Sequence, residues 1–421
     1  MKEDFLHFKW QHRLYDASSL TTTTGDEVVV SRTGTLNRSS GPDFAQAWLS
    51  IAGTRWVGAV EIHLRSSDWY VHRHDSDPAY DNVVLHVVYE HDREVVTRKG
   101  DVLPVLELKG RIQRQVLKRY QGLNHKAAGT PKHIPCVDIL PNISELEWRS
   151  WLDRVLVQRL MRKSNDVGMH VRTLRGNWIQ VYYTLLAGYF GGNWNKLSMF
   201  EMARRIPFTI LRHYSDEAIK RESLLLGVAN WLPSDAPGLY HREFEHLKRK
   251  HDIDACMLEW KTGSVRPDNA PLNRILQFSG VAVKVEDAFD QLIAQGDWDW
   301  SNVDLKLSDY WRKHIQVDKP RKKPLERLSK SMADLIKINV HAPLLYHYGE
   351  VAGDSSKKEM AVEMLHQIKP EQNQLMRSWN EWGRKPSSAG DSQAMIELYD
   401  QFCRLKKCVI CNVGQTLIKR V

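Results

Sequence analysis

The pattern of apolar and polar positions changes character near residue 110. Before that point, short β-branched and alternating segments predominate, and an opening amphipathic helix fits residues 2–16. The strands that this pattern predicts are 27–32, 44–51, 55–64, 82–89, 94–97 and 102–108. Turn residues separate them, as in Thr24-Gly25-Asp26, Ala52-Gly53-Thr54 and Lys99-Gly100-Asp101.

Helical spacing governs the chain beyond Arg111. Ser144 with Glu147 three residues later has the pattern of a capping box, which predicts a long helix through about Lys163. The other predicted helices are 176–190, 195–205, 216–230, 238–250, 271–282, 303–313, 357–367, 371–381 and 392–403. A basic, proline-broken segment at 319–324 indicates an exposed connection.

These patterns predict an α+β fold. An N-terminal mixed β-sheet domain with a flanking helix is expected over residues 1–125, and a mainly helical part over 126–421, with a break into two subdomains near 315–328. A chain of 421 residues is too long for one ordinary core, which favours such a division. The nearly all-apolar run 83–88 predicts a central strand buried on both faces.

Composition excludes several classes of protein. Hydrophobic residues make up 42% and charged residues 26%, as in globular rather than disordered chains. Neither a secretory signal nor an apolar stretch of membrane-spanning length is found, so a cytoplasmic protein with no membrane association is expected. The net charge of +9 favours a polyanionic partner such as nucleic acid. The oligomeric state stays open.

Two carboxylates and a histidine lie on neighbouring predicted strands. Strand periodicity puts Glu61 and His63 on one face and Val60, Ile62 and Leu64 on the other. A hairpin turn at 53–54 would place Asp43 opposite His63 or Leu64, one diagonal step from Glu61. At that separation one Mg²⁺ or Mn²⁺ ion can bind both carboxylates and complete its shell with water and phosphate.

The stretch that follows is dense in ionisable and aromatic side chains. His72 and His74 are two residues apart, so an extended backbone would aim both imidazoles the same way. With His63 or His86 they could form a histidine-rich transition-metal site, whereas a lone histidine in an apolar strand is more often a hydrogen-bonded core residue. The further candidate site residues are Ser67, Asp68, Asp75 and Tyr80.

The arrangement resembles the core of PD-(D/E)XK nucleases. In that superfamily an acidic residue, often after proline, begins one strand, and a second acidic residue stands on the next strand two positions before a lysine. Pro42-Asp43 and Glu61-Ile62-His63 match these two halves, with His63 in the lysine position. The resemblance implies that Asp43 and Glu61 hold a catalytic Mg²⁺ or Mn²⁺ ion and that His63 positions or activates water.

Three functions follow from these residues. The first is a metal-dependent phosphodiesterase acting on DNA or RNA, with the candidate phosphate contacts Arg65, Arg73, Arg266 and Arg274. The second is a hydrolase of another class whose metal is held by His63, His72, His74 and Asp75. The third is a catalytically inactive nucleic-acid-binding protein, for which a histidine in the lysine position is the best argument.

The cysteines suggest a second metal site. Cys403, Cys408 and Cys411 lie within nine residues, and a Cys-x2-Cys pair followed by glycine is typical of metal knuckles. Cys136 is the expected fourth ligand, so the metal would tie the C-terminus to the sheet region. The spacing does not separate structural zinc from an iron–sulfur cluster.

Over nearly its whole length the chain resembles an uncharacterised bacterial domain-of-unknown-function family, number 2851 in that series. The stretches that carry the resemblance are 41–44, 60–69, 83–92, 134–136, 266–269, 391–393 and the terminal cysteines. The family brings no established activity, so the resemblance informs the extent of the protein and not its reaction.

Overall fold

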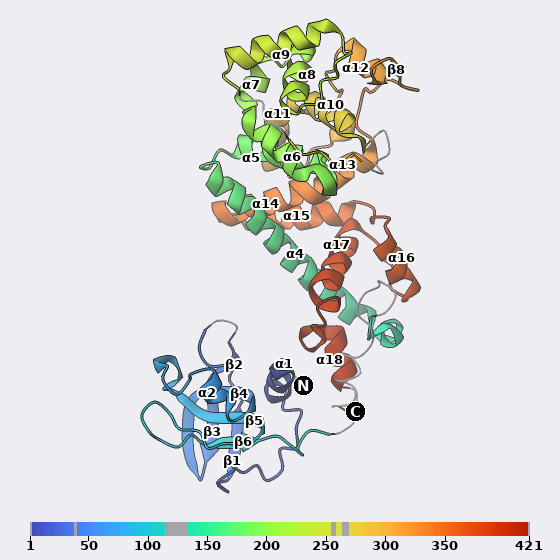
Figure 1. The fold of residues 1–421 in the computed structure, drawn as a ribbon. Helices are drawn as coiled ribbons and strands as arrows, with labels where there is room; N and C mark the ends of the chain where they lie inside the picture. The colour runs from blue at the N-terminus through green and yellow to red at the C-terminus, as the bar shows by residue number, and fades with distance from the viewer. Residues whose placement is uncertain are drawn as a thin grey trace. The chain divides into compact units, whose positions relative to one another are not determined.

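The structure is a computed structural model that describes residues 2–37, 40–113, 116, 134–253, 258–262 and 269–419 (Figure 1). The chain divides into two compact units. The first consists of residues 1–151, 377–385 and 398–421, and the second of residues 152–376 and 386–397. The expected α+β class is confirmed, with an N-terminal mixed sheet and a mainly helical remainder. The domain boundary expected at 125–126 lies outside the described residues.

The first unit is built on a six-stranded sheet with strand order β1-β3-β4-β5-β6, and β2 pairs with β3. β1, β3 and β4 are antiparallel, whereas β5 and β6 are parallel to β4. The elements of the N-terminal part are α1 (Glu3–Gln11), β1 (Val28–Arg32), β2 (Thr35–Leu36), β3 (Phe44–Ile51), β4 (Thr54–Arg65), α2 (Asp68–Val71), η1 (Pro78–Tyr80), β5 (Val83–Glu90) and β6 (Val105–Glu107). The expected strand at 94–97 is wrong, because that segment forms only a single bridge between Val96 and Val102.

Two hydrophobic clusters lie on opposite faces of this sheet. The apolar face of α1 packs on one face with Val60 and Ile62 of β4. Trp69 of α2 packs on the other face with Val88 of β5. The expected alternation along β4 is therefore confirmed, and β5 is buried on both faces as predicted.

The hairpin between β3 and β4 corrects the expected register. Ala52 and Gly53 form a two-residue turn with φ of 49° and 80°, and Ile51 pairs with Thr54. A bulge then follows at Gln46, whose φ is +55°, and Phe44 pairs with Val60. Asp43 consequently lies beside Glu61 rather than opposite His63 or Leu64, because the tighter turn and the bulge shift the pairing.

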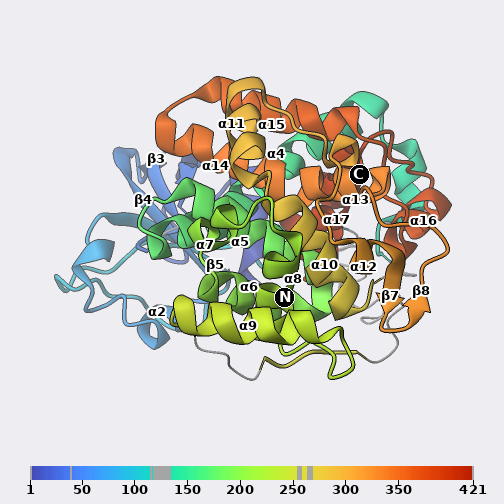
Figure 2. The same ribbon diagram turned by 90° about the horizontal axis from the view of Figure 1, so that it is seen from above.

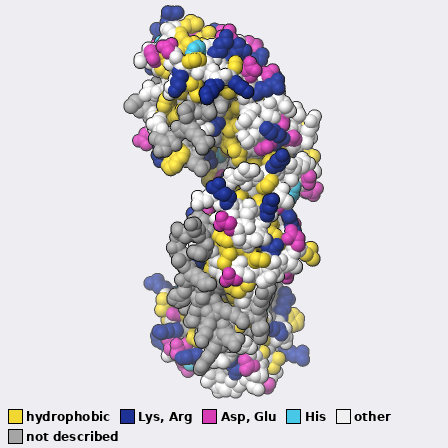
Figure 3. All heavy atoms as spheres, turned by 90° about the vertical axis from the view of Figure 1, so that its right-hand side faces the viewer, with side chains coloured by type: hydrophobic (Ala, Val, Ile, Leu, Met, Phe, Trp, Pro, Cys, Tyr) yellow, Lys and Arg dark blue, Asp and Glu magenta, His cyan; other side chains and the backbone are white. Residues whose placement is uncertain are grey.

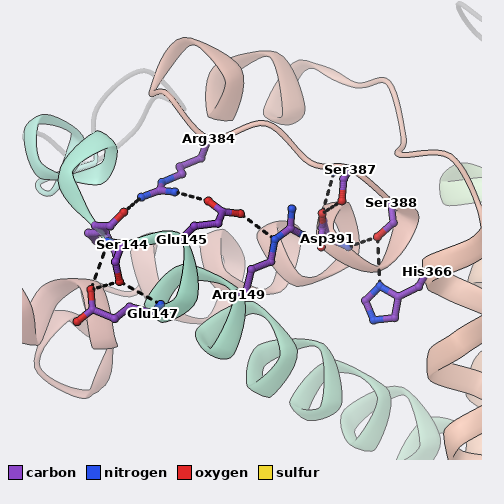
Figure 4. A network of polar contacts seen from close by, with 10 residues as sticks. Ser144, Glu145, Glu147, Arg149, His366, Arg384, Ser387, Ser388 and Asp391 are labelled. Carbon is purple, nitrogen blue, oxygen red and sulfur yellow. Dashed lines mark hydrogen bonds and ion pairs between the residues drawn. The ribbon is translucent and has the colours of Figure 1, made fainter.

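The remaining parts of the first unit come from the middle and the end of the chain. They are η2 (Val137–Asn142), the start of α4 (Glu145–Thr173), the end of α16 (Gln374–Glu381), the π-helical turn η6 (Tyr399–Cys403), η7 (Cys408–Ile410) and α18 (Asn412–Lys419). Val409 and Ile418 pack into the same cluster as α1. The capping box at the start of α4 is confirmed, since Ser144 Oγ accepts from the Glu147 N–H at 3.3 Å (Figure 4).

The second unit is helical apart from the hairpin of β7 (His314–Gln316) and β8 (Lys319–Pro320). Its other elements are α5 (Trp178–Phe190), α6 (Gly192–Arg205), α7 (Phe208–His213), α8 (Ala218–Val228), α9 (Gly238–Lys250), α10 (Pro271–Ala282), α11 (Val285–Gln295), η4 (Trp300–Asn302), α12 (Asp309–Lys313), α13 (Lys330–Ile336), η5 (Lys337–His341), α14 (Ala342–Ala352), α15 (Ser355–Gln367) and α17 (Ala389–Leu398). α9 lies along α8 (Figures 1 and 2), where Gly227 leaves room for the ring of Phe244.

Polar contacts fix α17 within the second unit. Asp391 accepts from the backbone and the hydroxyl of Ser387 at 2.8 and 2.7 Å (Figure 4). Gln393 and Glu397 accept from Arg159 at 2.6 and 2.9 Å. Residues 391–393, one of the stretches that carry the family resemblance, thus have a structural role. Their polar groups form the hydrogen bonds that a helix end and buried side chains require.

A candidate metal centre on the sheet

Histidine side chains and one carboxylate converge on the α2 face of the sheet. Glu61 and His63 come from β4, and His72 and His74 follow α2. His63 Nε2 lies 3.0 Å from His72 Nδ1 and 3.5 Å from Glu61 Oε1. His74 Nε2 lies 3.3 Å from the same oxygen. Within the described part of the chain, the three histidines form the one group of three or more His, Cys, Asp or Glu residues whose ligand atoms all lie within 4.8 Å.

The segment after α2 reaches this centre by a turn, not by the extended backbone that the sequence predicted. Arg73 adopts a left-handed conformation with φ of +61°, and residues 72–76 form turns. Both flanking imidazoles nevertheless reach His63. Tyr80 of η1 supports the outer side, because its ring stacks on His74 with 3.7 Å between the centroids.

Asp43 and α1 complete the neighbourhood of Glu61. The backbone N–H of Asp43 donates to Glu61 Oε2 at 2.9 Å, and Asp43 Oδ2 accepts from the Ile62 N–H at 3.0 Å. His7 of α1 lies with Nε2 3.1 Å from Asp43 Oδ2. Glu3, one turn earlier on α1, is close enough to interact with the charges of His7 and Asp43.

His86 of β5 stands behind the centre. Its Nε2 lies 2.9 Å from His63 Nδ1, and its side chain is fully buried. When His63 Nδ1–H donates to His86, the lone pair of His63 Nε2 faces His72 and Glu61. Ligand histidines in metalloproteins are commonly oriented by such a hydrogen bond through the second ring nitrogen. The expectation of a hydrogen-bonded histidine at this position is met.

Burial keeps His63 and His86 neutral. Burial and the neighbouring His72, His74 and His7 lower the pKa of His63 to about 3. Burial also lowers the pKa of His86 and raises that of Glu61. At neutral pH His63 is therefore an uncharged electron-pair donor. It differs in this from the lysine of the PD-(D/E)XK motif, which would be a fixed cation at the same position.

At the margin of the site, burial opposes the charged form of His7. Its hydrogen bond and charge interaction with Asp43 outweigh that effect and raise the pKa of His7.

The donor set fits a transition-metal ion. A tetrahedral ion with ligands at roughly 2.1 Å separates its ligand atoms by about 3.4 Å. Three distances here are close to that value: 3.0 Å for His63–His72, 3.5 Å for His63–Glu61 and 3.3 Å for His74–Glu61. The group whose ligand atoms all lie within 4.8 Å of one another consists of the three histidines, and Glu61 borders it. Imidazole suits zinc, iron and similar metals, and the carboxylate supplies a negative charge. Among the described residues, no arginine or lysine forms an ion pair with Glu61. A bound cation would therefore be the partner for the negative charge of this buried carboxylate.

Other expected site residues serve the fold around this centre. Ser67 donates to Asp92 at 2.7 Å, and Asp68 accepts from the Arg65 N–H at 2.9 Å, so both fix the start of α2. Asp75 is half-buried and makes no side-chain hydrogen bond or ion pair to any described residue.

The expected phosphate contacts belong to different units of the chain. Arg65 and Arg73 are exposed beside the centre. Arg274 belongs to the second unit, where it donates to Gln277 at 2.9 Å, and Arg266 lies outside the described residues.

Sequence reasoning missed His7 and Glu3. They stand four residues apart on the opening helix, so helical spacing puts them on one face. That spacing was the available signal, but the packing of α1 beside Asp43 is a contact between distant parts of the sequence.

A model of the family described as a protein of unknown function, DUF2851, matches residues 3–374. The chain belongs to this family. The expected membership is confirmed, and the DUF2851 match includes every residue of the histidine centre as well as Cys136. No curated protein and no solved structure matches the chain. None of the helices that the structure describes has the length and apolar character needed to span a membrane.

Proposed function

We propose that the chain is a metal-dependent hydrolase that cleaves phosphodiester bonds in nucleic acid. The observation that carries the proposal is the convergence of His63, His72 and His74, with Glu61 beside His63 and His74 and with Asp43 and His7 at the margin. A bound ion at this point would polarise a phosphoryl oxygen and lower the pKa of a bound water. The proposed metal is a transition metal, because three of the four donors are imidazoles.

The chain's own residues divide the remaining work. His86 holds His63 in the tautomer that presents Nε2, and Tyr80 keeps the ring of His74 in place by stacking. The hydrogen bonds from the Asp43 N–H to the Glu61 carboxylate and from the Ile62 N–H to the Asp43 carboxylate fix the two strands where the ligands emerge. His7 beside Asp43 is placed to hold a proton at the edge of the site.

The resemblance to PD-(D/E)XK nucleases supports phosphodiesters as the substrate. A helix and a strand precede Asp43, which directly precedes β3, while Glu61 and His63 lie on β4 and further strands follow. In this proposal His63 acts as a metal ligand in the position of the superfamily's lysine. The magnesium site expected between Asp43 and Glu61 becomes a second position, adjacent to the imidazole-bound ion and sharing Glu61.

Surface charge supports a polyanionic substrate. The chain carries 60 Lys and Arg residues against 51 Asp and Glu. In Figure 3, Lys and Arg side chains are numerous on the face of the second unit that carries α9, α12 and β8. The exposed basic residues of these elements include Arg249, Lys250, Lys313 and Lys319. Such charges bind phosphate backbones without regard to sequence by displacing counterions.

The test combines metal content with cleavage. Full-length protein is freed of metal and reloaded with Mn²⁺, Zn²⁺, Fe²⁺ or Mg²⁺, and each form is incubated with single- and double-stranded DNA and RNA. The expected result is cleavage with at least one transition metal. His72→Ala and Glu61→Gln are expected to lose both the metal and at least 100-fold of the rate.

Two matched controls accompany these variants. His246→Ala replaces an exposed histidine of α9, and Asp101→Asn an exposed aspartate of the sheet unit. Both are expected to keep metal content and rate. Asp43→Asn separates the two metal positions, since the imidazole-bound ion should be retained while cleavage falls. Absence of bound metal, or equal cleavage by wild type and His72→Ala, would overturn the proposal.

The second candidate keeps the metal and changes the substrate. The observation that favours it is that the centre is richer in imidazole than in carboxylate, whereas Mg²⁺-dependent phosphoryl transfer uses oxygen ligands. Metal-dependent turnover of a small ester or amide, with nucleic acid left intact, would support this reading and reject the nuclease. Tight DNA binding that is insensitive to chelator and to Glu61→Gln would instead indicate an inactive binding protein.

A further inference from the structure

Four cysteines from separate segments meet in the first unit. Cys136 precedes η2, Cys403 ends η6, and Cys408 and Cys411 begin and follow η7. Cys403 lies close enough to interact electrostatically with each of the other three. Cys136 likewise interacts with Cys408 and Cys411, and none of the four forms a disulfide. Cys403, Cys408 and Cys411 are close in the sequence, and the fold brings Cys136 near them.

The turn from Cys408 to Cys411 is folded around a sulfur. The N–H of Cys411 donates to the Cys408 carbonyl at 3.3 Å, and the backbone N–H groups of Val413 and Gly414 donate to the sulfur of Cys411. Cys411 directly precedes α18, whose positive N-terminal end also favours a thiolate. A Cβ at Gly414 would lie 2.1 Å from the Cys408 carbonyl oxygen, so only glycine fits this turn.

Surrounding groups hold the other sulfurs in place. Trp151 lies close enough to interact with the sulfur of Cys411, and its ring packs on Phe402 with 5.5 Å between the centroids, next to Cys403. Val409, between Cys408 and Cys411, is buried in the sheet's hydrophobic cluster. Arg384 binds the carbonyl of Leu140 at 2.6 Å and so fixes the segment that starts at Cys136.

We infer that Cys136, Cys403, Cys408 and Cys411 together bind one tetrathiolate metal centre that fastens the C-terminal segment to the sheet unit. Thiolates are the ligands that zinc and iron–sulfur clusters prefer. Hydrogen bonds from backbone N–H groups are stronger to a thiolate than to a neutral thiol, whose sulfur is a weak acceptor. This inference is independent of the proposed function.

The spacing of the sulfurs separates the two kinds of centre. A single zinc ion with Zn–S bonds of about 2.3 Å holds its sulfurs about 3.8 Å apart. Among the described residues only the histidine group has all its ligand atoms within 4.8 Å, so no three of these sulfurs are that close. An iron–sulfur cluster fits a wider set because its own iron and sulfide lie between the cysteines. Zinc would instead draw the turn at 408–411 toward Cys136.

The experiment measures metal in full-length protein purified without oxygen. Zinc, iron and acid-labile sulfide are counted in wild type, Cys136→Ser and Cys411→Ser. About one zinc per chain, or several irons with matching sulfide, is expected in wild type, and a loss of at least 80% in each variant. Cys256→Ser, the fifth cysteine of the chain, and His72→Ala should retain this metal, which separates it from the histidine centre.

A second measurement needs no variant to fold. Releasing the metal from wild type should make four further thiols reactive toward a thiol reagent and expose residues 398–421 to protease. Wild type with less than about 0.1 equivalent of metal that takes up neither Zn²⁺ nor a reconstituted cluster would overturn the inference. An unchanged thiol count after metal release would overturn it as well.

Discussion

Arg384 fastens the segment after Cys136 from inside the first unit. Only 7% of its surface is exposed. Its guanidinium donates to the Leu140 carbonyl at 3.0 and 2.6 Å and also to the Ile143 carbonyl, and it lies 5.0 Å from the ring centre of Trp148. Arg384→Met keeps much of the apolar stem and removes every one of these donors.

The cost follows from the two carbonyls. Leu140 is fully buried and Ile143 is 7% exposed, so neither acceptor gains water in the variant. A buried acceptor left without a partner costs about 1–3 kcal/mol, and loss of the cation–π contact adds about 0.5–2 kcal/mol. The ion pair with Glu145, whose side chain is 65% exposed, contributes little. The expected loss in unfolding free energy is about 3–5 kcal/mol.

Urea unfolding measures the global loss, and amide hydrogen exchange over residues 137–151 measures the local one. Arg204→Met removes an exposed arginine paired with Glu201 at 2.9 Å and should cost less than about 0.5 kcal/mol. Faster exchange confined to 137–151 is expected in Arg384→Met. A loss below about 1 kcal/mol, with unchanged exchange in that segment, would refute the reasoning.

Three further predictions test other parts of the chain. Burial raises the pKa of Glu222 to about 7 from 4.5, so the folded state keeps this proton where the unfolded state has lost it. The free energy of unfolding should therefore fall by about 3 kcal/mol as pH rises from about 4 to about 8. Glu222→Gln should remove this pH dependence in urea unfolding. An unchanged pH dependence in the variant would contradict the raised pKa of Glu222. A Cβ at Gly58 would lie 2.4 Å from a methyl group of Val84. Gly58→Ala should therefore lower the free energy of unfolding by about 1–3 kcal/mol, measured by thermal unfolding. A neutral effect would count against the packing of β4 on β5. Tyr80→Ala should weaken metal binding about tenfold in chelator competition because His74 loses its stacking partner, whereas Tyr80→Phe should not; equal affinities would reject the supporting role.

Local patterns predicted the elements that are stabilised by neighbouring residues. The strands at 44–51 and 83–90 and the helix opened by Ser144 agree with the sequence, because alternation and a capping box act over a few positions. The predicted helix at 303–313 covers only Asp309–Lys313, since Ser308 caps the Trp311 N–H and starts the helix there. The helix pair α13 and α14 was missed. Pro343 stands in the first turn of α14, directly after the π-helical turn η5, where a proline is tolerated.

The candidate site was predictable only as far as its ligands share one strand or one loop. Alternation on β4 identified Glu61 and His63, and the short spacing of His72 and His74 marked the loop. The position of Asp43 was wrong by two to three residues because the hairpin turn is tighter than expected and the bulge at Gln46 leaves no local signal. His7 could not be assigned, since its contact with Asp43 depends on how α1 packs, and 35 residues of chain lie between the two.

The replacement of lysine by histidine at position 63 bears directly on whether the centre is active. A lysine there would be a fixed cation beside Glu61, whereas His63, 2% exposed and with a pKa of about 3, is neutral and offers a lone pair. A decayed site would be expected to lose its buried polar groups, because burying unpaired imidazoles and a carboxylate costs several kcal/mol. In this chain the polar groups of the site are retained. His72 and His74 converge on His63 and Glu61, and His86 holds His63 from behind. The substitution therefore argues for a different metal at this position more strongly than for a lost one.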